Sequence, residues 1–320
     1  MLYRKEIDGL RALAVIPVIL FHAGFENFSG GYVGVDVFLV ISGYLITSII
    51  LLEKKSGTFK LSSFYERRVR RIFPALYLVI FTSIPFAYFL LSPGYLKEFS
   101  ESLIPVTLFI SNIWFWQETG YFATANELSP LIHTWSLAVE EQYYLLFPLF
   151  ILLTWKYGSK LILVIITLTL LLSLFVSHWG AIYHQTANFF LLPSRAWELL
   201  IGVLLAFYLH TKKKNITSNS FHQIASFFGI VLILYAVFKF DENTLFPSLY
   251  ALVPTLGSAL IILFASNNTL VGRLLSVKPL VLLGLISYSI YLWHQPLFAF
   301  YRHADIYHSD KLPYLFLMLL

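Results

Sequence analysis

Arg11 and His22 are the first two residues of the chain whose types and spacing suggest chemistry. They lie within an apolar stretch, and ionisable side chains inside a membrane are costly and usually functional. Because eleven residues are close to three helical turns, the two side chains share one face of a helix, roughly 16 Å apart. A histidine in this setting can serve as a general base or a nucleophile, whereas an arginine can bind phosphate.

Further ionisable residues interrupt the apolar stretches and form two groups. The first is predicted to share one cavity with His22 in the outer half of the membrane, and it comprises Asp36, Glu140 beside Glu141, Arg195, Glu198 and His294. The second lies at the inner end and comprises Arg11, Arg67, Arg68, Arg70 and Arg71. Guanidinium groups suit phosphate oxygens, so we expect acid–base chemistry at the outer end and phosphate binding at the inner end.

The composition indicates a membrane protein. The chain has 320 residues, of which 58% are hydrophobic and only 12% are charged, whereas soluble domains carry about 25% charged residues. The net charge of +5 does not indicate nucleic-acid binding, because the basic residues lie between apolar spans, where the positive-inside rule expects them. The absence of cysteine excludes disulfides, thiolate nucleophiles and cysteine-ligated metals.

Apolar runs of about 20 residues, the length of a membrane helix, recur along the chain. They cover residues 10–24, 33–52, 72–91, 136–155, 160–178, 194–210, 224–240, 249–266 and 279–300, and another begins near residue 312. We therefore predict an all-α integral membrane protein, a polytopic bundle of about ten transmembrane helices with the last one truncated. Residues 1–320 form a single transmembrane domain in this interpretation.

The segment 103–116 is apolar but short, and the distribution of charge decides how we interpret it. The loop 53–71 is rich in Lys and Arg, and the loops near 156–160, 212–214 and 273–278 are also basic. These loops all lie on the cytoplasmic side only if 103–116 does not cross the membrane. We therefore predict that this segment is re-entrant or interfacial and that the N-terminus is cytoplasmic.

Six motifs resemble those of the acyltransferase-3 family of membrane acyltransferases. They are R-A-L-A-V-I-P-V-I-L-F-H from Arg11 to His22, G-G-Y-V-G-V-D-V-F-L-V-I-S-G-Y-L-I-T from Gly30 to Thr47, F-Y-E-R-R-V-R-R-I-F-P from Phe64 to Pro74, H-T-W-S-L-A-V-E-E-Q-Y-Y from His133 to Tyr144, R-A-W-E-L-L-I-G from Arg195 to Gly202 and S-Y-S-I-Y-L-W-H-Q-P from Ser287 to Pro296. The motifs follow the family's order and cover almost the whole chain.

The resemblance implies transfer of an acyl group, most often acetyl, from cytoplasmic acyl-CoA to a hydroxyl of a surface glycan such as lipopolysaccharide O-antigen, or of a lipid-linked saccharide. It implies a bacterial cytoplasmic (inner) membrane and no permanently bound cofactor. No metal is expected, because the scattered histidines lack ligand spacing. Some relatives carry an esterase-type domain after an extra helix, so a further helix and domain beyond residue 320 are compatible with the resemblance.

We expect His22 to be the general base or a transient acyl carrier, assisted by Asp36 or Glu140, with His294 also in the catalytic site. The residues expected to bind the donor are Arg11, Arg67, Arg68, Arg70 and Arg71. Those expected to bind substrate are Trp135, Gln142, Arg195 and Glu198.

Structural interpretations stay open for several of these residues. Asp36 could be a helix N-cap rather than a partner of His22, and Glu140 could form an ion pair with Arg195. The arginine cluster could serve only to orient the chain, and His294 could belong to an interfacial belt. A secondary transporter that exports a lipid or glycan is the alternative function, and a non-catalytic subunit of an envelope assembly is a third.

Overall fold

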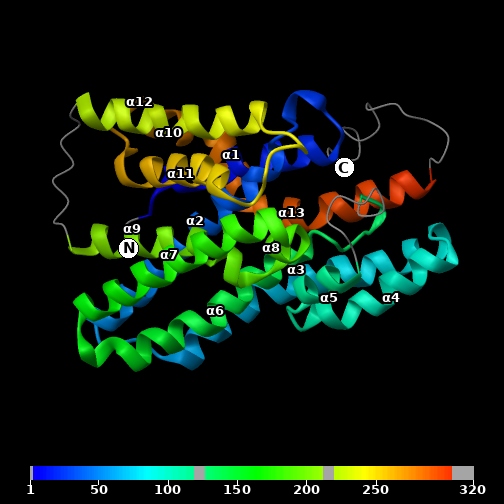
Figure 1. The fold of residues 1–320 in the computed structure, drawn as a ribbon, viewed down its shortest axis with the longest axis horizontal. Coiled ribbons are helices and arrows are strands. Elements are labelled where there is room, and N and C mark those ends of the chain that lie inside the picture. Colours follow the sequence, from blue (N-terminus) through cyan, green and yellow to red (C-terminus); the bar gives the residue numbers. More distant parts are fainter. Residues whose placement is uncertain (1–2, 119–126, 212–219, 305–320) are drawn as a thin grey trace.

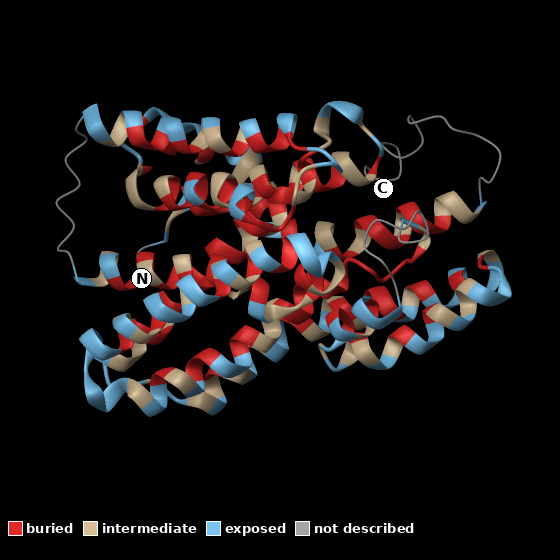
Figure 2. Ribbon diagram, in the orientation of Figure 1, coloured by how far each residue is buried: buried red, intermediate tan, exposed pale blue. Residues whose placement is uncertain are grey.

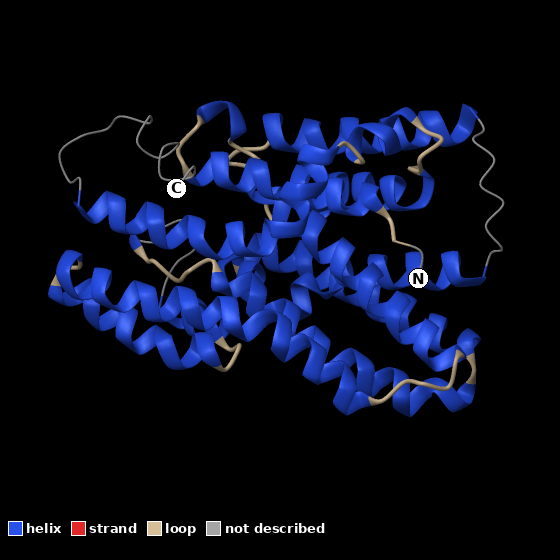
Figure 3. Ribbon diagram, turned by 180° about the vertical axis from the view of Figure 1, so that it is seen from behind, coloured by secondary structure: helices blue, strands red, loops and turns tan. Residues whose placement is uncertain are grey.

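Long helices lie side by side along one axis of the molecule (Figure 1). The computed structural model describes residues 3–118, 127–211 and 220–304. Every regular element in these ranges is helical, and they contain no strand (Figure 3). A helix satisfies its own backbone hydrogen bonds, which a segment surrounded by lipid requires.

The helices at the nine predicted spans are α1 (Lys5–His22), α2 (Gly34–Lys55), α3 (Leu61–Leu90), α6 (Thr134–Thr154), α7 (Ser159–Tyr183), α9 (Leu192–Thr211), α10 (Ser220–Lys239), α11 (Leu252–Phe264) and α13 (Lys278–Ala304). The other helices are α4 (Pro93–Thr107), α5 (Ser111–Glu118), α8 (Gln185–Phe190) and α12 (Leu270–Leu275). Short 3-10 turns are η1 (Glu26–Phe28), η2 (Gly31–Val33), η4 (Trp155–Tyr157) and η5 (Leu249–Ala251).

Seven helices in the described ranges are long and apolar enough to cross a membrane, namely α2, α3, α6, α7, α9, α10 and α13. Of the remaining two predicted spans, α1 packs along α13 and the shorter α11 packs along α10. The prediction of an all-α polytopic membrane protein is therefore confirmed. The span predicted near residue 312 lies outside the described residues.

The outward faces of the peripheral helices are apolar, as a lipid-facing surface requires. Leu153 of α6 is 73% exposed, Phe175 of α7 is 67% exposed and Phe227 of α10 is 64% exposed. Figure 2 shows buried residues along the interior of the bundle and exposed residues along its outer helices. The hydrocarbon of a bilayer would cover these side chains.

The segment predicted to be re-entrant forms the helical hairpin α4–α5. Its two helices have 15 and 8 residues, which is too short to span a membrane. The chain turns at Phe109, whose φ is 55°. Gln142 of α6 fixes the turn, because its Nε2 donates to the carbonyl oxygen of Phe109 at 2.9 Å and to Oδ1 of Asn112 at 2.8 Å. The turn of the hairpin is therefore held against α6.

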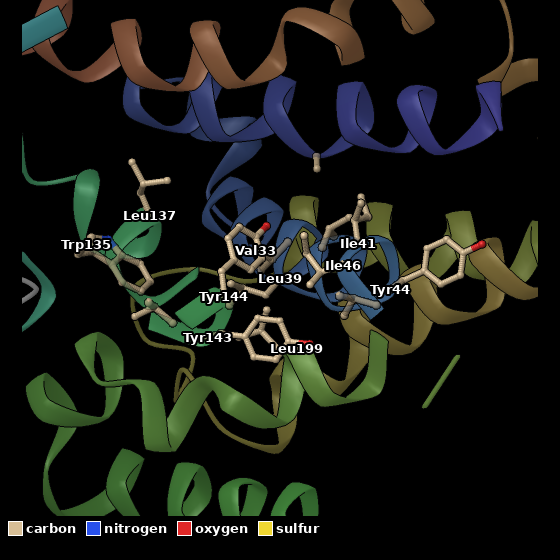
Figure 4. Close-up of a cluster of buried hydrophobic side chains, with 14 of the residues drawn as sticks. Val33, Leu39, Ile41, Tyr44, Ile46, Trp135, Leu137, Tyr143, Tyr144 and Leu199 are labelled. Carbon is tan, nitrogen blue, oxygen red and sulfur yellow. The ribbon is translucent and has the colours of Figure 1, made fainter. Parts of the chain in front are cut away.

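Glycines allow the central helices to approach closely. A Cβ on Gly43 of α2 would lie 2.0 Å from the carbonyl oxygen of Leu199 in α9, and one on Gly202 of α9 would lie 2.2 Å from that of Val40. Small residues at helix interfaces are the usual device for such packing in membranes. Figure 4 shows the apolar side chains of α2, α6 and α9 that fill the adjoining core.

Helices α1 and α13 run in the same direction, which brings two of the predicted catalytic residues to one end of the bundle. Near their beginnings, Gly284 of α13 packs against the backbone of Asp8 in α1. Near their ends, Nη2 of Arg302 in α13 donates to the carbonyl oxygen of His22 at 2.5 Å. His22 and His294 therefore meet toward the same end, which we call the histidine end.

Candidate active site

Three histidines from three parts of the chain form a cluster at the histidine end. His22 is the last residue of α1, His133 precedes α6, and His294 lies within α13. The ring centroid of His294 lies 5.1 Å from that of His22 and 5.3 Å from that of His133. The structure thus brings His22 and His294 together, as predicted, and adds His133, the first residue of the fourth motif.

Hydrogen bonds to carbonyl groups define the protonation of two of these rings. Nδ1 of His22 lies 2.8 Å from the carbonyl oxygen of Val18, and Nδ1 of His294 lies 2.5 Å from that of Tyr291. Because a carbonyl oxygen can only accept, each neutral ring carries its proton on Nδ1 and keeps a lone pair on Nε2. Nε2 of His294 is buried without a hydrogen-bond partner in the described part of the chain. Each Nε2 is therefore available as a base.

The last turns of α13 bind two parts of the chain: the end of α1, and the segment before α6 that leads to His133. Nε2 of Gln295 donates to the carbonyl oxygens of Glu127 and Ser129, each at 3.2 Å. Arg302 donates to the carbonyl oxygens of His22 and Glu127, and its Nη2 lies 3.3 Å from Oε2 of Glu127. Sequence reasoning missed both residues, although Gln295 directly follows His294 in the last motif.

A separate cavity of about 160 Å³ lies between α1, α2, α3, α6 and α13. Along α2 it extends from Val35 to Ile49, a length of about 21 Å at 1.5 Å per residue. Its other lining residues are Arg11, Phe38, Leu39, Ile41, Ser42, Leu45, Ile46, Arg68, Arg71, Ile72, Ser136, Leu137, Glu140, Glu141, Tyr144, Ser287, Tyr288 and Tyr291. The cavity is therefore long, narrow and mainly apolar.

Only part of the predicted arginine group lines this cavity. Arg11, Arg68 and Arg71 lie at the end away from the histidines, which we call the arginine end. Arg67 and Arg70 belong to exposed ion pairs instead: Arg67 lies 2.7 Å from Glu53 and Arg70 lies 2.7 Å from Glu66. The prediction that the whole cluster faces one site is therefore wrong. Residues three apart share one face of a helix, so Arg68 and Arg71 line the cavity together, whereas Arg67 and Arg70, each one residue earlier, lie on a different face.

Glu140 and Glu141 lie in the cavity rather than with the histidines. Oε1 of Glu140 accepts hydrogen bonds from the hydroxyls of Ser42 and Tyr144. Oε1 of Glu141 is buried without a hydrogen-bond partner among the residues that the structure describes. The two carboxylates therefore face the same enclosed space as the three cavity arginines.

Asp36, Arg195 and Glu198 form a third, fully buried group. Nη2 of Arg195 lies 3.2 Å from Oδ1 of Asp36, and its Nη1 lies 3.1 Å from Oε1 of Glu198. The side chains are at most 1% exposed. The guanidinium also lies 5.6 Å from the ring centroid of Trp135 and 5.8 Å from that of Phe189. Aromatic faces and carboxylates thus enclose the charge of Arg195.

This third group corrects two expectations. Asp36 pairs with Arg195, whereas Nδ1 of His22 is held by a backbone carbonyl. Glu140 is bonded by Ser42 and Tyr144 rather than paired with Arg195. The prediction that all six residues share a single outer cavity is therefore wrong. The position of a residue in the sequence indicates its depth in the membrane, but it does not indicate which neighbouring helix its side chain faces.

The four residues predicted to bind substrate do not line the cavity. Trp135 packs on Arg195, and Arg195 pairs with Glu198. Gln142 anchors the turn of the α4–α5 hairpin. In this structure all four make contacts that hold helices together, so substrate binding by them stays a prediction.

Tyr291 lies between the cavity and the histidine cluster. Its side chain lines the cavity, and its ring centroid lies 5.2 Å from that of His294 and 5.5 Å from that of His133. Its hydroxyl lies 2.6 Å from Oγ of Ser136 and donates to the carbonyl oxygen of His133 at 3.0 Å. Tyr291 therefore contacts both the cavity and the histidine cluster.

The chain is similar to an acyltransferase family and to bacterial O-acetyltransferases. A family model for the acyltransferase-3 domain, described as an acyltransferase domain, matches residues 4–320. The peptidoglycan O-acetyltransferase OatA of Listeria monocytogenes is 35% identical over 310 residues, which cover 92% of this chain and 49% of that protein. The O-acetyltransferase OatA of Staphylococcus aureus is 31% identical over 309 residues, which cover 93% of this chain and 51% of that protein.

A further relative is the putative peptidoglycan O-acetyltransferase YrhL of Bacillus subtilis, 34% identical over 312 residues, which cover 92% of this chain and 48% of that protein. The chain thus spans about half the length of the curated relatives it matches. No solved structure matches it.

Proposed function

We propose that this chain, which belongs to the acyltransferase-3 family, transfers an acetyl group from cytoplasmic acyl-CoA to a hydroxyl of cell-wall glycan. One observation carries the proposal. The ring of Tyr291 lines a long, mainly apolar cavity that also holds three arginines, and the same ring contacts His294, which contacts His22 in turn.

The cavity suits the donor better than it suits a sugar. The phosphates of coenzyme A are the chemical match for Arg11, Arg68 and Arg71. The pantetheine arm is a long, slender chain, which matches the length of the cavity along α2. A donor with its phosphates at the arginine end would direct its thioester toward Tyr291 and the histidines. No permanently bound cofactor or metal enters this scheme.

The transfer needs one base and no further reagent. The acceptor hydroxyl oxygen attacks the thioester carbonyl carbon, the new C–O bond replaces the C–S bond, and Nε2 of His22 takes the hydroxyl proton. Coenzyme A leaves as the thiolate and receives that proton. Arg302 positions His22 by its bond to the His22 carbonyl oxygen, and His294 lies against the ring of His22.

The orientation in the proposal follows from charge. The basic loop after α2 lies at the arginine end, close to the turn after α6, because Nζ of Lys54 lies 5.7 Å from the ring centroid of Trp155. Basic loops favour the cytoplasmic side. The arginine end of the cavity then faces the cytoplasm, where acyl-CoA is found, and the histidine end faces outward, where the glycan is found.

The names of the relatives favour peptidoglycan as the acceptor over the lipopolysaccharide O-antigen suggested by the motifs. Two of the three relatives described above are named for peptidoglycan. A lipid-linked saccharide precursor presents the same hydroxyl chemistry to the histidine end. Mass spectrometry of cell-wall glycan with and without the gene identifies both the acceptor and the acyl group.

Substitution of His22 tests the chemistry. A His22→Ala variant, expressed at the wild-type level, should lose nearly all acetylation of cell-wall glycan, since general-base catalysis contributes about 10²–10⁴-fold. His184→Ala is the matched control, because His184 is exposed at the far end of α7. Wild-type acetylation in His22→Ala would remove His22 from the mechanism. A transporter, the alternative function, predicts no acyl-CoA turnover by the purified wild-type protein.

A further inference from the structure

We propose that Tyr291 sets the length of the acyl group that the enzyme accepts, because its ring closes the outer end of the donor cavity and leaves room for a short chain only. The inference rests on the proposed function, since it takes the cavity as the site of an acyl-CoA. It assigns Tyr291 a role in donor specificity, as the wall against which the acyl group ends.

The cavity has a basic end and an end at Tyr291. Arg11, Arg68 and Arg71 lie at the first, and Tyr291 with Ser136 lies near the second. A thioester whose phosphates stay on the arginines reaches the end at Tyr291 with its acyl group foremost. The acyl group is therefore the part of the donor that meets Tyr291.

The tyrosine ring is held in place from several sides. Its hydroxyl bonds Oγ of Ser136 at 2.6 Å and the carbonyl oxygen of His133 at 3.0 Å. Its ring lies between Phe38, at 6.5 Å, and His294, at 5.2 Å between centroids. Neighbouring rings therefore restrain the ring of Tyr291 in addition to the hydrogen bonds of its hydroxyl, and densely packed interiors resist displacement of such a side chain.

The position of the histidines makes this wall restrictive. The ring of His294 lies 5.2 Å from that of Tyr291, and the ring of His22 lies 5.1 Å from that of His294. The thioester carbonyl must come close to the ring to be within reach of a base and of the acceptor hydroxyl. Each additional methylene between the carbonyl and the wall would hold the carbonyl back toward the arginines. One methylene in a closely fitting pocket changes specificity by about 10–200-fold.

A series of donors tests the proposal. The purified protein in detergent would receive acetyl-CoA, propionyl-CoA or butyryl-CoA with a soluble peptidoglycan fragment, and the acylated fragment would be measured by mass spectrometry. We expect the wild-type protein to prefer acetyl over propionyl in kcat/KM by about 10–200-fold. Tyr291→Ala should reduce this preference to less than about tenfold and admit butyryl.

Two further variants distinguish a specific effect of the Tyr291 ring on donor length from a general disturbance of the cavity. Tyr288→Ala removes a tyrosine from the same helix and the same cavity, but the hydroxyl of Tyr288 donates to the carbonyl oxygen of Ile72 in α3. It should keep the wild-type ranking of the three donors whatever its rate. Tyr291→Phe keeps the ring and should also keep the ranking.

The outcomes are distinct. An unchanged ranking in Tyr291→Ala, or an equal change in Tyr288→Ala, would overturn the role of Tyr291 while leaving the proposed function intact. A wild-type protein that transfers none of the three acyl groups would overturn the proposed function itself. If Tyr291→Ala does not accumulate in the membrane, Tyr291→Leu carries the same prediction, because Leu also shortens the wall.

Discussion

Neutralising Asp36 distinguishes the structural role of the buried ion pair from the catalytic role that the sequence suggested. At the observed 3.2 Å, the attraction between Asp36 and Arg195 amounts to about 5 kcal/mol for an effective dielectric constant of about 20. Glu198 still pairs with Arg195 when Asp36 is replaced, so part of the charge stays compensated. Breaking one side of a buried ion pair costs about 3–5 kcal/mol. We therefore expect Asp36→Asn to lower stability by about 3 kcal/mol.

An exposed ion pair of shorter length provides the control. Arg70 and Glu66 lie 2.7 Å apart, yet their side chains are 78% and 59% exposed. Water screens such pairs, whose contribution is about 0–1 kcal/mol. Glu66→Gln should therefore leave stability nearly unchanged although its ion pair is the shorter one. Burial rather than distance decides the difference.

Thermal unfolding of the two purified variants in the same detergent measures the effect. Asp36→Asn should lower Tm by about 4–5 °C, and Glu66→Gln by about 2 °C or less. The acetylation activity of Asp36→Asn at a permissive temperature should follow the amount of folded protein. A variant with wild-type Tm but without activity would refute this reasoning and restore Asp36 as a catalytic partner.

Two further predictions follow from the cavity and from the helix interface. Arg71→Ala should raise the KM for acyl-CoA about tenfold, because a charge-assisted bond to phosphate is lost. Arg70→Ala should leave this KM unchanged, because Arg70 does not line the cavity. Steady-state kinetics measures both variants, and equal effects on KM would contradict the assignment of Arg71. Gly43→Ala should destabilise the α2–α9 interface by about 3 kcal/mol or more, because its Cβ would lie 2.0 Å from the carbonyl oxygen of Leu199. Gly94→Ala is the control, because a Cβ at Gly94 meets open space. Comparable Tm values for the two variants would show that the helices separate more easily than this packing implies.

The sequence alone determined the class of the protein and the positions of its spans. Apolar runs of membrane length are a local property, so each predicted span up to residue 300 coincides with a helix. The prediction that the segment 103–116 does not cross the membrane came from the alternation of basic loops, which can also be recognised from the sequence without knowledge of the fold. The pairing of His22 with His294 at one end of the bundle followed from the same topology.

Only the tertiary structure decided which polar residues share a space. Asp36, Glu140 and His22 lie at similar expected depths in the membrane, yet they enter an ion pair, a cavity and a histidine cluster respectively. The rotation of each helix about its axis makes that choice, and it depends on packing contacts such as Gly43 against α9. No pattern within one apolar segment reveals the face that its neighbours will cover. For the same reason, no sequence pattern indicated that Tyr291 would line the cavity and also contact the histidine cluster.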